Sequence, residues 1–564
     1  MKNRIIRTTL CILMTGALIT INGCSMFLED NHERPEDYKP YYESTVGAEQ
    51  SLSELPRDSF RMEEYDKLLA KFKKLLEEPG NEEELLLTYD ELVLAYDSFS
   101  SDYGLIQYDF YLNPQNEELG DKVEEYATTD VSIQDDTFTA FREVFDTDYA
   151  DAFTEYLDED VAEAYAAYES LTEEQEKLAN EVQALVLEYD SMINEEDQSE
   201  EWTQRAKQLY VDLVNKNTAL AKASGYDSYV EYAYDAVYGR DYTYEDIQNT
   251  ESIVAEKVLP VLLAYTDLCV TDGDIEAAYE ENTDSGETKY ENLIDGVYEI
   301  NQELGETMDH LFEVGLVDID SSEEKMSIGY TMSLPYYMDA YVFDCPYDMY
   351  YDYQTVIHEF GHYNNMYHNY YPGLLEPSNV DVSEIHSQGL EVLYVDHYED
   401  AVGGYGEALK ESTLYNLMSA VINGYAVNEM EYLAYTTEDL TVEKLDAIVD
   451  DVNAKYLTSE DILSDYINIS HIYESPFYYI GYATSALAAL ELYQMSQEDW
   501  DQAVDTYMNI TNSSLYTPFL ETLENIGMQD ALDSQVQQKL FDELAEDLDV
   551  AEDLDWYIEY VQQQ

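Results

Sequence analysis

The sequence places His358 and His362 four residues apart around Glu359, in the pentapeptide HEFGH. Histidines with this spacing project from one face of a helix, so both can bind the same zinc ion. Glu359 lies one residue round the helix, where its carboxylate can take a proton from a water beside the metal without binding the metal itself. The chain has eight histidines, and half of them lie within residues 358–386. This clustering favours a zinc peptidase motif over two incidental histidines.

A catalytic zinc site needs a third protein ligand, and the sequence offers two. His368 follows His358 by ten residues, a spacing that resembles the HExxHxxGxxH motif of metzincins, with Asn365 in place of the glycine. Asparagine tolerates the left-handed conformation that the glycine serves there, so His368 stays possible. Glu384 follows His362 by 22 residues, which leaves room for a loop and a returning helix, as in gluzincins. Spacing alone leaves both ligands open.

Residues 381–391 read DVSEIHSQGLE. Together with HEFGH, this segment resembles the D-x-x-E-x-x-S-Q-x-x-E motif of the thimet oligopeptidase and oligoendopeptidase F family. The resemblance implies one zinc ion with Glu384 as its third ligand. Asp381 and Glu391 are candidates to orient the ligand histidines, although both also suit exposed helix positions. His386 departs from the family pattern, since the thimet branch usually has proline there.

Residues 471–482 read HIYESPFYYIGY, which resembles the HxFExPFYYxxY segment of the oligoendopeptidase F branch. The resemblance implies that His471, Tyr482 and a second tyrosine hold the substrate carbonyl and the developing oxyanion. Tyr479, one helical turn before Tyr482, is our second tyrosine, and Tyr478 competes with it. The run from Lys325 to His362 also resembles the family, so that the likeness is strong over residues 325–490.

Elsewhere the sequence predicts a mainly α protein. Residues 65–78, 177–195 and 204–224 carry apolar residues three or four apart, as amphipathic helices do. Only residues 326–345, just before the predicted zinc helix, have the β-branched and aromatic character of strands. They predict a small β-sheet, either a structural hairpin or an edge that binds the substrate backbone. The family resemblance implies a large helical bowl around a deep channel, with zinc at its floor.

The charge of the chain limits its partners. Aspartate and glutamate number 123 against 26 lysines and arginines, which gives a net charge of −97. Such a surface repels phosphate backbones, so nucleic acid is excluded as an expected partner, whereas cationic peptides and metal ions are attracted.

The N-terminus predicts export. Basic residues at positions 2, 4 and 7 precede a largely apolar stretch, and Gly23-Cys24 then resembles a bacterial lipobox. We expect a lipoprotein signal peptide at 1–23 and lipidation of Cys24, which would anchor the protein to the bacterial membrane facing outside the cytoplasm. The rest divides into an acidic tether at 24–45, an N-terminal helical region at 46–200 and a zinc peptidase catalytic domain at 201–564.

Together these features predict a zinc-dependent oligoendopeptidase that hydrolyses short peptides, with Glu359 as general base. Two alternatives stay open. One is a metzincin-type protease with His368 as third ligand. The other is a lipoprotein that binds peptide or metal without catalysis, for which Glu359 would serve no purpose.

Overall fold

Helices form most of the chain in the computed structural model. The structure describes residues 47–563 except for 78, 158–160, 163–164, 167, 169–171, 194–198, 273–289, 291, 323, 327, 348, 370–372, 376–378, 458–461 and 514. The predicted signal peptide, the tether and Cys24 lie outside the described residues. A mainly α protein with a small sheet near the helix of the HEFGH motif is confirmed, whereas the deep channel stays a prediction. Within the described ranges, no helix combines the length and the apolar character that crossing a membrane requires.

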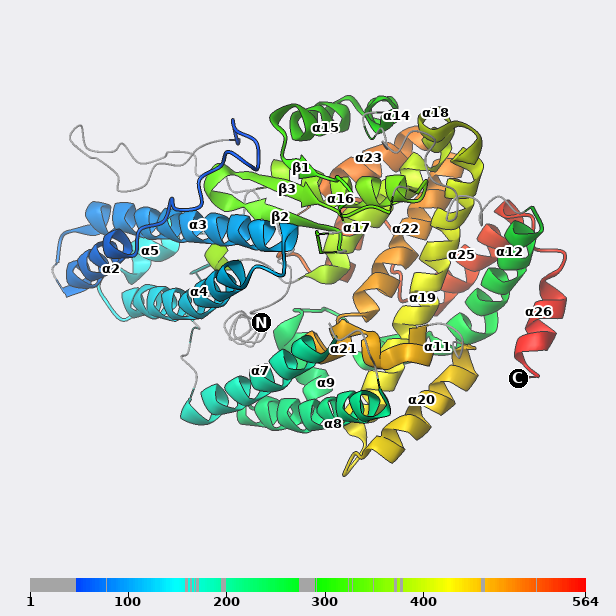
Figure 1. Ribbon diagram of the computed structural model, residues 1–564, viewed down its shortest axis with the longest axis horizontal. Helices are drawn as coiled ribbons and strands as arrows, with labels where there is room; N and C mark the ends of the chain where they lie inside the picture. Colours follow the sequence, from blue (N-terminus) through cyan, green and yellow to red (C-terminus); the bar gives the residue numbers. More distant parts are fainter. Residues whose placement is uncertain are drawn as a thin grey trace.

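The first helices form a unit with a hydrophobic core of their own (Figure 1). They are α2 (Met62–Glu77), α3 (Glu82–Leu112), α4 (Glu117–Val144) and α5 (Ala150–Tyr156). Aromatic rings fill this core, with Phe141 packed edge-on against both Phe72 and Tyr165. Leu374, from the loop after the zinc helix, is fully buried in the same core. The unit is therefore tied to the segment that connects the two predicted ligand helices.

The remaining helices pack around a second, larger core. They are α7 (Glu173–Ile193), α8 (Glu200–Ala223), α9 (Tyr229–Tyr232), the π-helix η1 (Ala233–Val237), α10 (Tyr244–Gln248), α11 (Glu251–Ile253), the π-helix η2 (Val254–Val258), α12 (Leu259–Asp272), α14 (Asn292–Ile300), α15 (Gln302–Val314), α16 (Asp352–His368), α17 (Val380–Tyr394), α18 (Tyr398–Val402), α19 (Gly406–Thr436), α20 (Val442–Tyr456), α21 (Ser470–Glu474), α22 (Ile480–Glu498), α23 (Trp500–Thr511), α24 (Phe519–Ile526), α25 (Ser534–Asp547) and α26 (Leu554–Val561). Short 3-10 turns are η3 (Pro335–Tyr337), η4 (Gly373–Leu375), η5 (Val395–His397), η6 (Gly403–Tyr405) and η7 (Ile462–Asn468).

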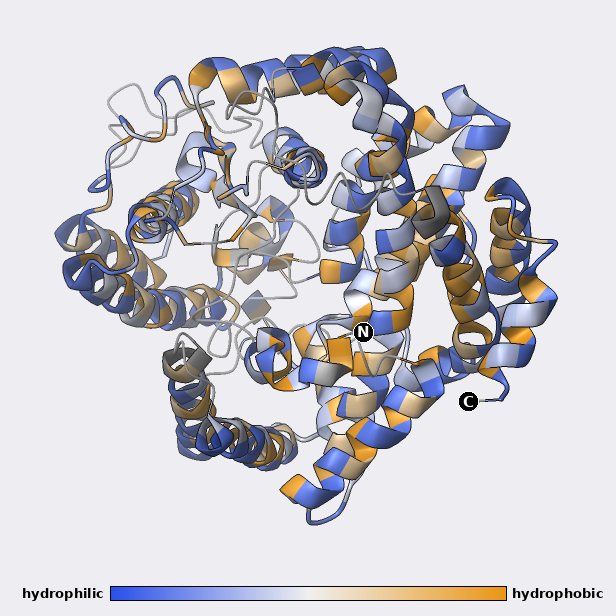
Figure 2. Ribbon diagram, turned by 45° about the vertical axis from the view of Figure 1, so that its right-hand side comes forward, coloured by the Kyte–Doolittle hydropathy of each residue, from blue (hydrophilic) through white to orange (hydrophobic). Residues whose placement is uncertain are grey.

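Peripheral and central helices differ in their hydropathy. Most outer helices alternate hydrophilic and hydrophobic residues along their turns (Figure 2), as expected for helices with one face in water. By contrast, α17 is buried at every residue. Helix α22 begins with the small and apolar run IGYATSALAALELY, which suits a helix enclosed on all sides. Helices α16, α17 and α22 thus form the centre of the larger core and carry the predicted metal ligands as well as Glu359 and Tyr482.

The predicted region 326–345 supplies two strands of a three-stranded sheet in the order β1-β3-β2, and β1 precedes that region. The strands are β1 (Val317–Asp318), β2 (Tyr330–Leu334) and β3 (Asp339–Phe343). Strand β1 pairs parallel with β3, and β2 pairs antiparallel with β3, with Thr331 opposite Val342. Strand β2 is therefore an edge strand, as required by the hypothesis that residues 326–345 bind the substrate backbone. It also packs against α16, so the sheet supports the zinc helix directly.

Candidate metal centre

Helices α16 and α17 bring three of the predicted ligands together. The Oε2 atom of Glu384 lies 3.6 Å from Nε2 of His358 and 3.5 Å from Nε2 of His362. All three ligand atoms lie within 4.8 Å of one another. Ligands about 2.0–2.2 Å from a tetrahedral zinc ion are separated by roughly 3.3–3.6 Å, and both distances to the Glu384 oxygen lie in that range. Two imidazoles and one carboxylate are also a ligand set that zinc accepts in catalytic sites.

His358 is oriented by a neighbouring carboxylate. Its Nδ1 lies 2.7 Å from Oε1 of Glu391, which leaves Nε2 directed toward Glu384. Burial alone would lower the pKa of His358, but the hydrogen bond to Glu391 and the charges of three nearby glutamates raise it to about 10. A metal ion entering the site must therefore displace a proton from this ring. Glu391 makes the contact that would fix the ring orientation.

Glu384 is held in its charged form. Burial opposes this, but the charge and hydrogen bond of His362, then the charge of His358 and the hydrogen bond of Ser387, lower the pKa of Glu384 to about 2. The Ser387 hydroxyl donates to Oε2 of Glu384 at 3.0 Å. The predicted third ligand is thus an anion that is already fixed by the residue one turn later on α17.

Glu359 is buried beside the two histidines, and the edge strand fixes its position. The Thr331 hydroxyl lies 2.7 Å from Oε2 of Glu359 and 2.9 Å from the backbone oxygen of the same residue. One carboxylate oxygen is therefore tethered to strand β2. Thr331 was not among the residues that the sequence suggested, because a threonine within a predicted strand carries no chemical signal of its own.

The predicted oxyanion residues gather around His471. The Tyr482 hydroxyl lies 3.4 Å from Nε2 of His471, and the rings of Tyr478 and Tyr479 lie 5.1 Å and 5.6 Å from the His471 ring. Burial lowers the pKa of His471 to about 4, so the ring is neutral at pH 7. Burial, and then the negative charge of Glu384 among others, raises the pKa of both Tyr478 and Tyr482 well above 10. These phenols keep their protons at neutral pH and can act as donors.

His368 and Asp381 lie in other environments. His368, the alternative third ligand, contacts the Thr307 hydroxyl at 2.9 Å, and its Nδ1 lies 3.7 Å from Oε1 of Glu303 on α15. The structure does not bring it to the motif histidines. Asp381, a candidate to orient a ligand histidine, instead pairs with Arg240. Arg240 was not suggested by the sequence, because it lies 141 residues before its partner.

Gly361 allows the two ligand helices to approach each other. A Cβ atom at this position would lie 2.4 Å from the His386 carbonyl oxygen and 2.6 Å from the Cα of Ser387, and both are backbone atoms of α17. We expect Gly361→Ala to lower the free energy of unfolding by about 1–3 kcal/mol, measured by urea denaturation, because neither helix can yield cheaply. Gly120→Ala in α4 is the control, since its Cβ would meet only the Phe110 ring at 3.6 Å. Equal unfolding energies of the two variants would contradict the close helix contact.

The whole chain was compared with known proteins. No family model matches it, and neither does any curated protein. Solved structures do match. A structure described as oligoendopeptidase F is 18% identical, with a TM-score of 0.73 over 89% of this chain and 99% of that one. PZ peptidase A with an inhibitor is 17% identical, with a TM-score of 0.73 over 89% and 100%. An oligoendopeptidase F structure from Bacillus anthracis is 17% identical, with a TM-score of 0.70 over 90% and 100%. Over nearly its whole length, the chain therefore has the fold of the oligoendopeptidase F and PZ peptidase structures.

Proposed function

We propose that this protein is a zinc-dependent oligoendopeptidase that hydrolyses short peptides. The observation that carries the proposal is the convergence of His358, His362 and Glu384 on one point, with Glu359 held beside them. The matched structures named as peptidases support the same reaction class.

The two histidines and Glu384 would hold the zinc ion. When bound, zinc supplies Lewis acidity toward water and toward the peptide carbonyl. Glu359 is not one of the converging ligands. Its carboxylate accepts the proton of the attacking water and then passes it to the leaving amine. The hydroxyl of Thr331 donates to one of its oxygens and so limits the orientations of the carboxylate.

His471 and the tyrosines act on the substrate oxygen. As the carbonyl carbon becomes tetrahedral, its oxygen gains negative charge, and neutral imidazole and phenol groups can donate hydrogen bonds to it. Tyr482 and His471 already lie within 3.4 Å of each other, from α22 and α21 respectively. Tyr479 is our second tyrosine, with Tyr478 as its competitor.

The edge strand β2 suits the substrate backbone. An extended peptide can add to an open sheet edge through main-chain hydrogen bonds, which bind many sequences alike. Strand β2 carries Thr331, the residue that contacts Glu359, so a peptide on this edge would lie next to the general base.

Removal of the Tyr482 hydroxyl tests the oxyanion role. We expect Tyr482→Phe to lower kcat by about 100- to 1,000-fold with little change in KM, because the lost hydrogen bond strengthens only as charge develops. Steady-state kinetics on one peptide measures this. The same substitution at Tyr478 and at Tyr479 identifies the second donor by the larger loss of kcat. An unchanged kcat in Tyr482→Phe would remove this tyrosine from the mechanism.

Cleavage of an internally quenched fluorescent peptide tests the reaction itself. The zinc-loaded protein should cleave it, a chelator should stop cleavage, and added zinc should restore it. If the zinc-loaded protein shows no turnover, the peptidase proposal fails, and the non-catalytic binding lipoprotein becomes the better account.

We also propose that Cys24 carries a lipid that anchors the protein outside the cytoplasm. The support is the basic and apolar N-terminus followed by Gly23-Cys24. Mass spectrometry of the N-terminal peptide from native membranes would detect a diacylglyceryl cysteine. An unmodified Cys24 in that peptide would overturn the proposal.

A further inference from the structure

We propose that a buried clamp centred on Arg240 positions His471 and Tyr482 relative to the metal-ligand helix α17. The Arg240 clamp consists of Arg240, Tyr238, Glu431 and Asp381. The inference rests on the proposed peptidase function, in which His471 and Tyr482 contact the substrate. These clamp residues are positioning residues, because they act through other side chains.

The clamp holds a strained turn. Residues 475–479 connect α21, which carries His471, to α22, which carries Tyr482. Within this turn, Phe477 has φ of +68°, in the left-handed region that a bulky side chain rarely adopts. Such a conformation persists only when its surroundings determine it, and strain of this kind concentrates at functional sites. The turn sets how far His471 lies from Tyr482.

Three side chains hold this turn through hydrogen bonds to its backbone. The guanidinium of Arg240 donates from Nη1 to the Phe477 carbonyl at 2.9 Å. The Tyr238 hydroxyl lies 3.0 Å and 3.1 Å from the carbonyl oxygens of Ser475 and Pro476. On the other side, the Phe477 amide donates to the Glu431 carboxyl group, 3.0 Å from either oxygen. Both polar backbone groups of the strained residue are thus fixed by side chains from outside the turn.

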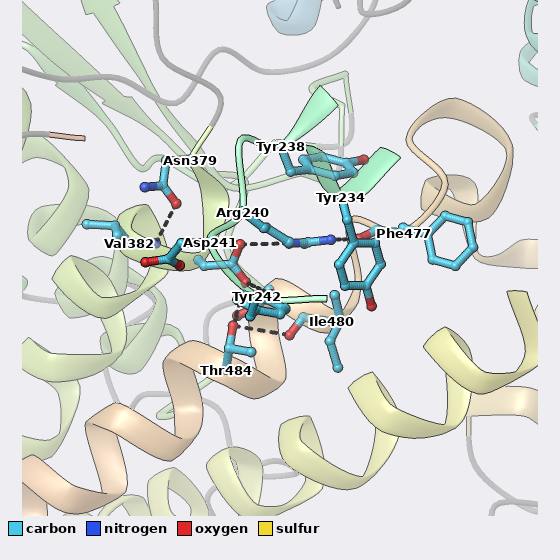
Figure 3. Close-up of polar contacts among 12 residues, drawn as sticks. Tyr234, Tyr238, Arg240, Asp241, Tyr242, Asn379, Val382, Phe477, Ile480 and Thr484 are labelled. Carbon is cyan, nitrogen blue, oxygen red and sulfur yellow. Dashed lines mark hydrogen bonds and ion pairs between the residues drawn. The ribbon is translucent and has the colours of Figure 1, made fainter. Parts of the chain in front are cut away.

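The same guanidinium reaches the ligand helix. Its Nε donates to Oδ2 of Asp381 at 2.9 Å, and both side chains are fully buried. Asp381 lies on α17 three residues before Glu384, so the two carboxylates are one helical turn apart. Figure 3 shows Arg240 directed toward Phe477, with Tyr234 and Tyr238 near its guanidinium. A single side chain therefore spans the metal-ligand helix and the oxyanion turn.

Polar groups and aromatic rings surround the buried ion pair of the clamp. The remaining oxygen of Asp381 accepts hydrogen bonds from Tyr242 and Thr484, both at 2.6 Å. Glu431 is also buried, and its burial raises the pKa of its carboxyl group well above the usual value. The cation of Arg240 pairs with Asp381, and the tyrosine rings that flank it, centred 4.8 Å and 4.5 Å away, add cation–π attraction.

The stability of the core does not require this buried ion pair. Buried ion pairs are often replaced by apolar residues with no loss of stability, because desolvation of the charges offsets their attraction. What an apolar substitute cannot do is fix backbone carbonyls in a defined direction. The clamp does this at the turn between the two predicted donors, which is why we assign it to positioning.

Tyr238→Phe, with Tyr234→Phe as its matched control, tests the clamp. Both tyrosines are buried, flank Arg240 and donate their hydroxyls to a buried acceptor, but Tyr234 donates to Asn428 and not to the turn. We expect Tyr238→Phe to lower kcat at least about tenfold at full zinc occupancy, with KM and zinc content unchanged, because small shifts of catalytic donors reduce rates steeply. The kcat of Tyr234→Phe should stay within about twofold of the kcat of the unaltered protein.

A second measurement is the binding of a phosphinic peptide, which imitates the tetrahedral intermediate. Its affinity should weaken at least about tenfold in Tyr238→Phe alone, as measured by calorimetry.

Arg240→Lys extends the test, since lysine keeps the charge but lacks the fork that reaches both Asp381 and Phe477. We expect a larger loss of kcat than in Tyr238→Phe. Because this buried variant can fail to fold, the comparison of Tyr238→Phe with Tyr234→Phe is the deciding test of the clamp. If the unaltered protein cleaves the peptide and the two tyrosine variants have equal kcat and equal phosphinate affinity, the clamp inference is overturned. If the zinc-loaded unaltered protein does not cleave at all, it is the proposed function that fails.

Discussion

Glu359→Gln is expected to reduce kcat by about 100- to 10,000-fold while the protein retains its zinc. The amide has nearly the shape of the carboxylate and can still accept the hydrogen bond from Thr331, but it cannot take a proton from water. A factor of 10,000 corresponds to about 5.4 kcal/mol of lost transition-state stabilisation. The measurement is the rate of cleavage of one quenched peptide, with bound zinc quantified in the same samples.

The matched control for this variant is Glu303→Gln. Glu303 lies at the start of α15 beside His368 and is absent from the metal centre. Its substitution should leave both rate and zinc content unchanged. A Glu359→Gln protein that contains zinc and cleaves at the normal rate would rule out Glu359 as the general base.

Glu384→Gln should weaken zinc binding by more than about 100-fold. Loss of a residue that only orients a metal ligand typically lowers metal affinity by about 10- to 100-fold, and Glu384 is itself a ligand in our account. The substitution removes the only carboxylate among the three converging ligands of the described chain. Competition with a chromogenic chelator measures the affinity. Cleavage should fall in parallel at limiting zinc.

His368→Gln is the counterpart, since it separates the two third-ligand hypotheses. His368 contacts Thr307 and Glu303. Its loss should therefore leave zinc affinity within about twofold of that of the unaltered protein. The opposite pattern, with metal lost from His368→Gln and retained in Glu384→Gln, would show that the metzincin-type arrangement is correct.

The sequence predicted the parts of this site that depend on local periodicity. The spacing of His358 and His362 requires only one helix, and α16 provides it. The choice between His368 and Glu384 as third ligand required information beyond local periodicity, because the spacing allows either residue. The family resemblance favoured Glu384, and the structure places this residue beside both histidines. The close crossing of α16 and α17 at Gly361 explains how Glu384, 22 positions after His362, returns to the two histidines.

The supporting residues could not be predicted, because they reach the site through tertiary packing. Thr331 comes from a strand 28 residues before Glu359, and Arg240 lies 237 residues before the Phe477 carbonyl that it binds. No periodicity connects such pairs. The choice between Tyr478 and Tyr479 is of the same kind. They are adjacent residues at the end of the turn that contains Phe477, and the conformation of that turn decides which hydroxyl faces the substrate.

The central claim, a single zinc ion that makes this chain a peptidase, is tested most directly by titration of metal-depleted protein with zinc while peptide cleavage is followed. We predict that the initial rate rises linearly with added zinc and reaches its plateau at one equivalent per chain. The ligand variant Glu384→Gln should need a large excess of zinc before any rise is seen. Binding of one equivalent of zinc without cleavage of any peptide offered would contradict the account.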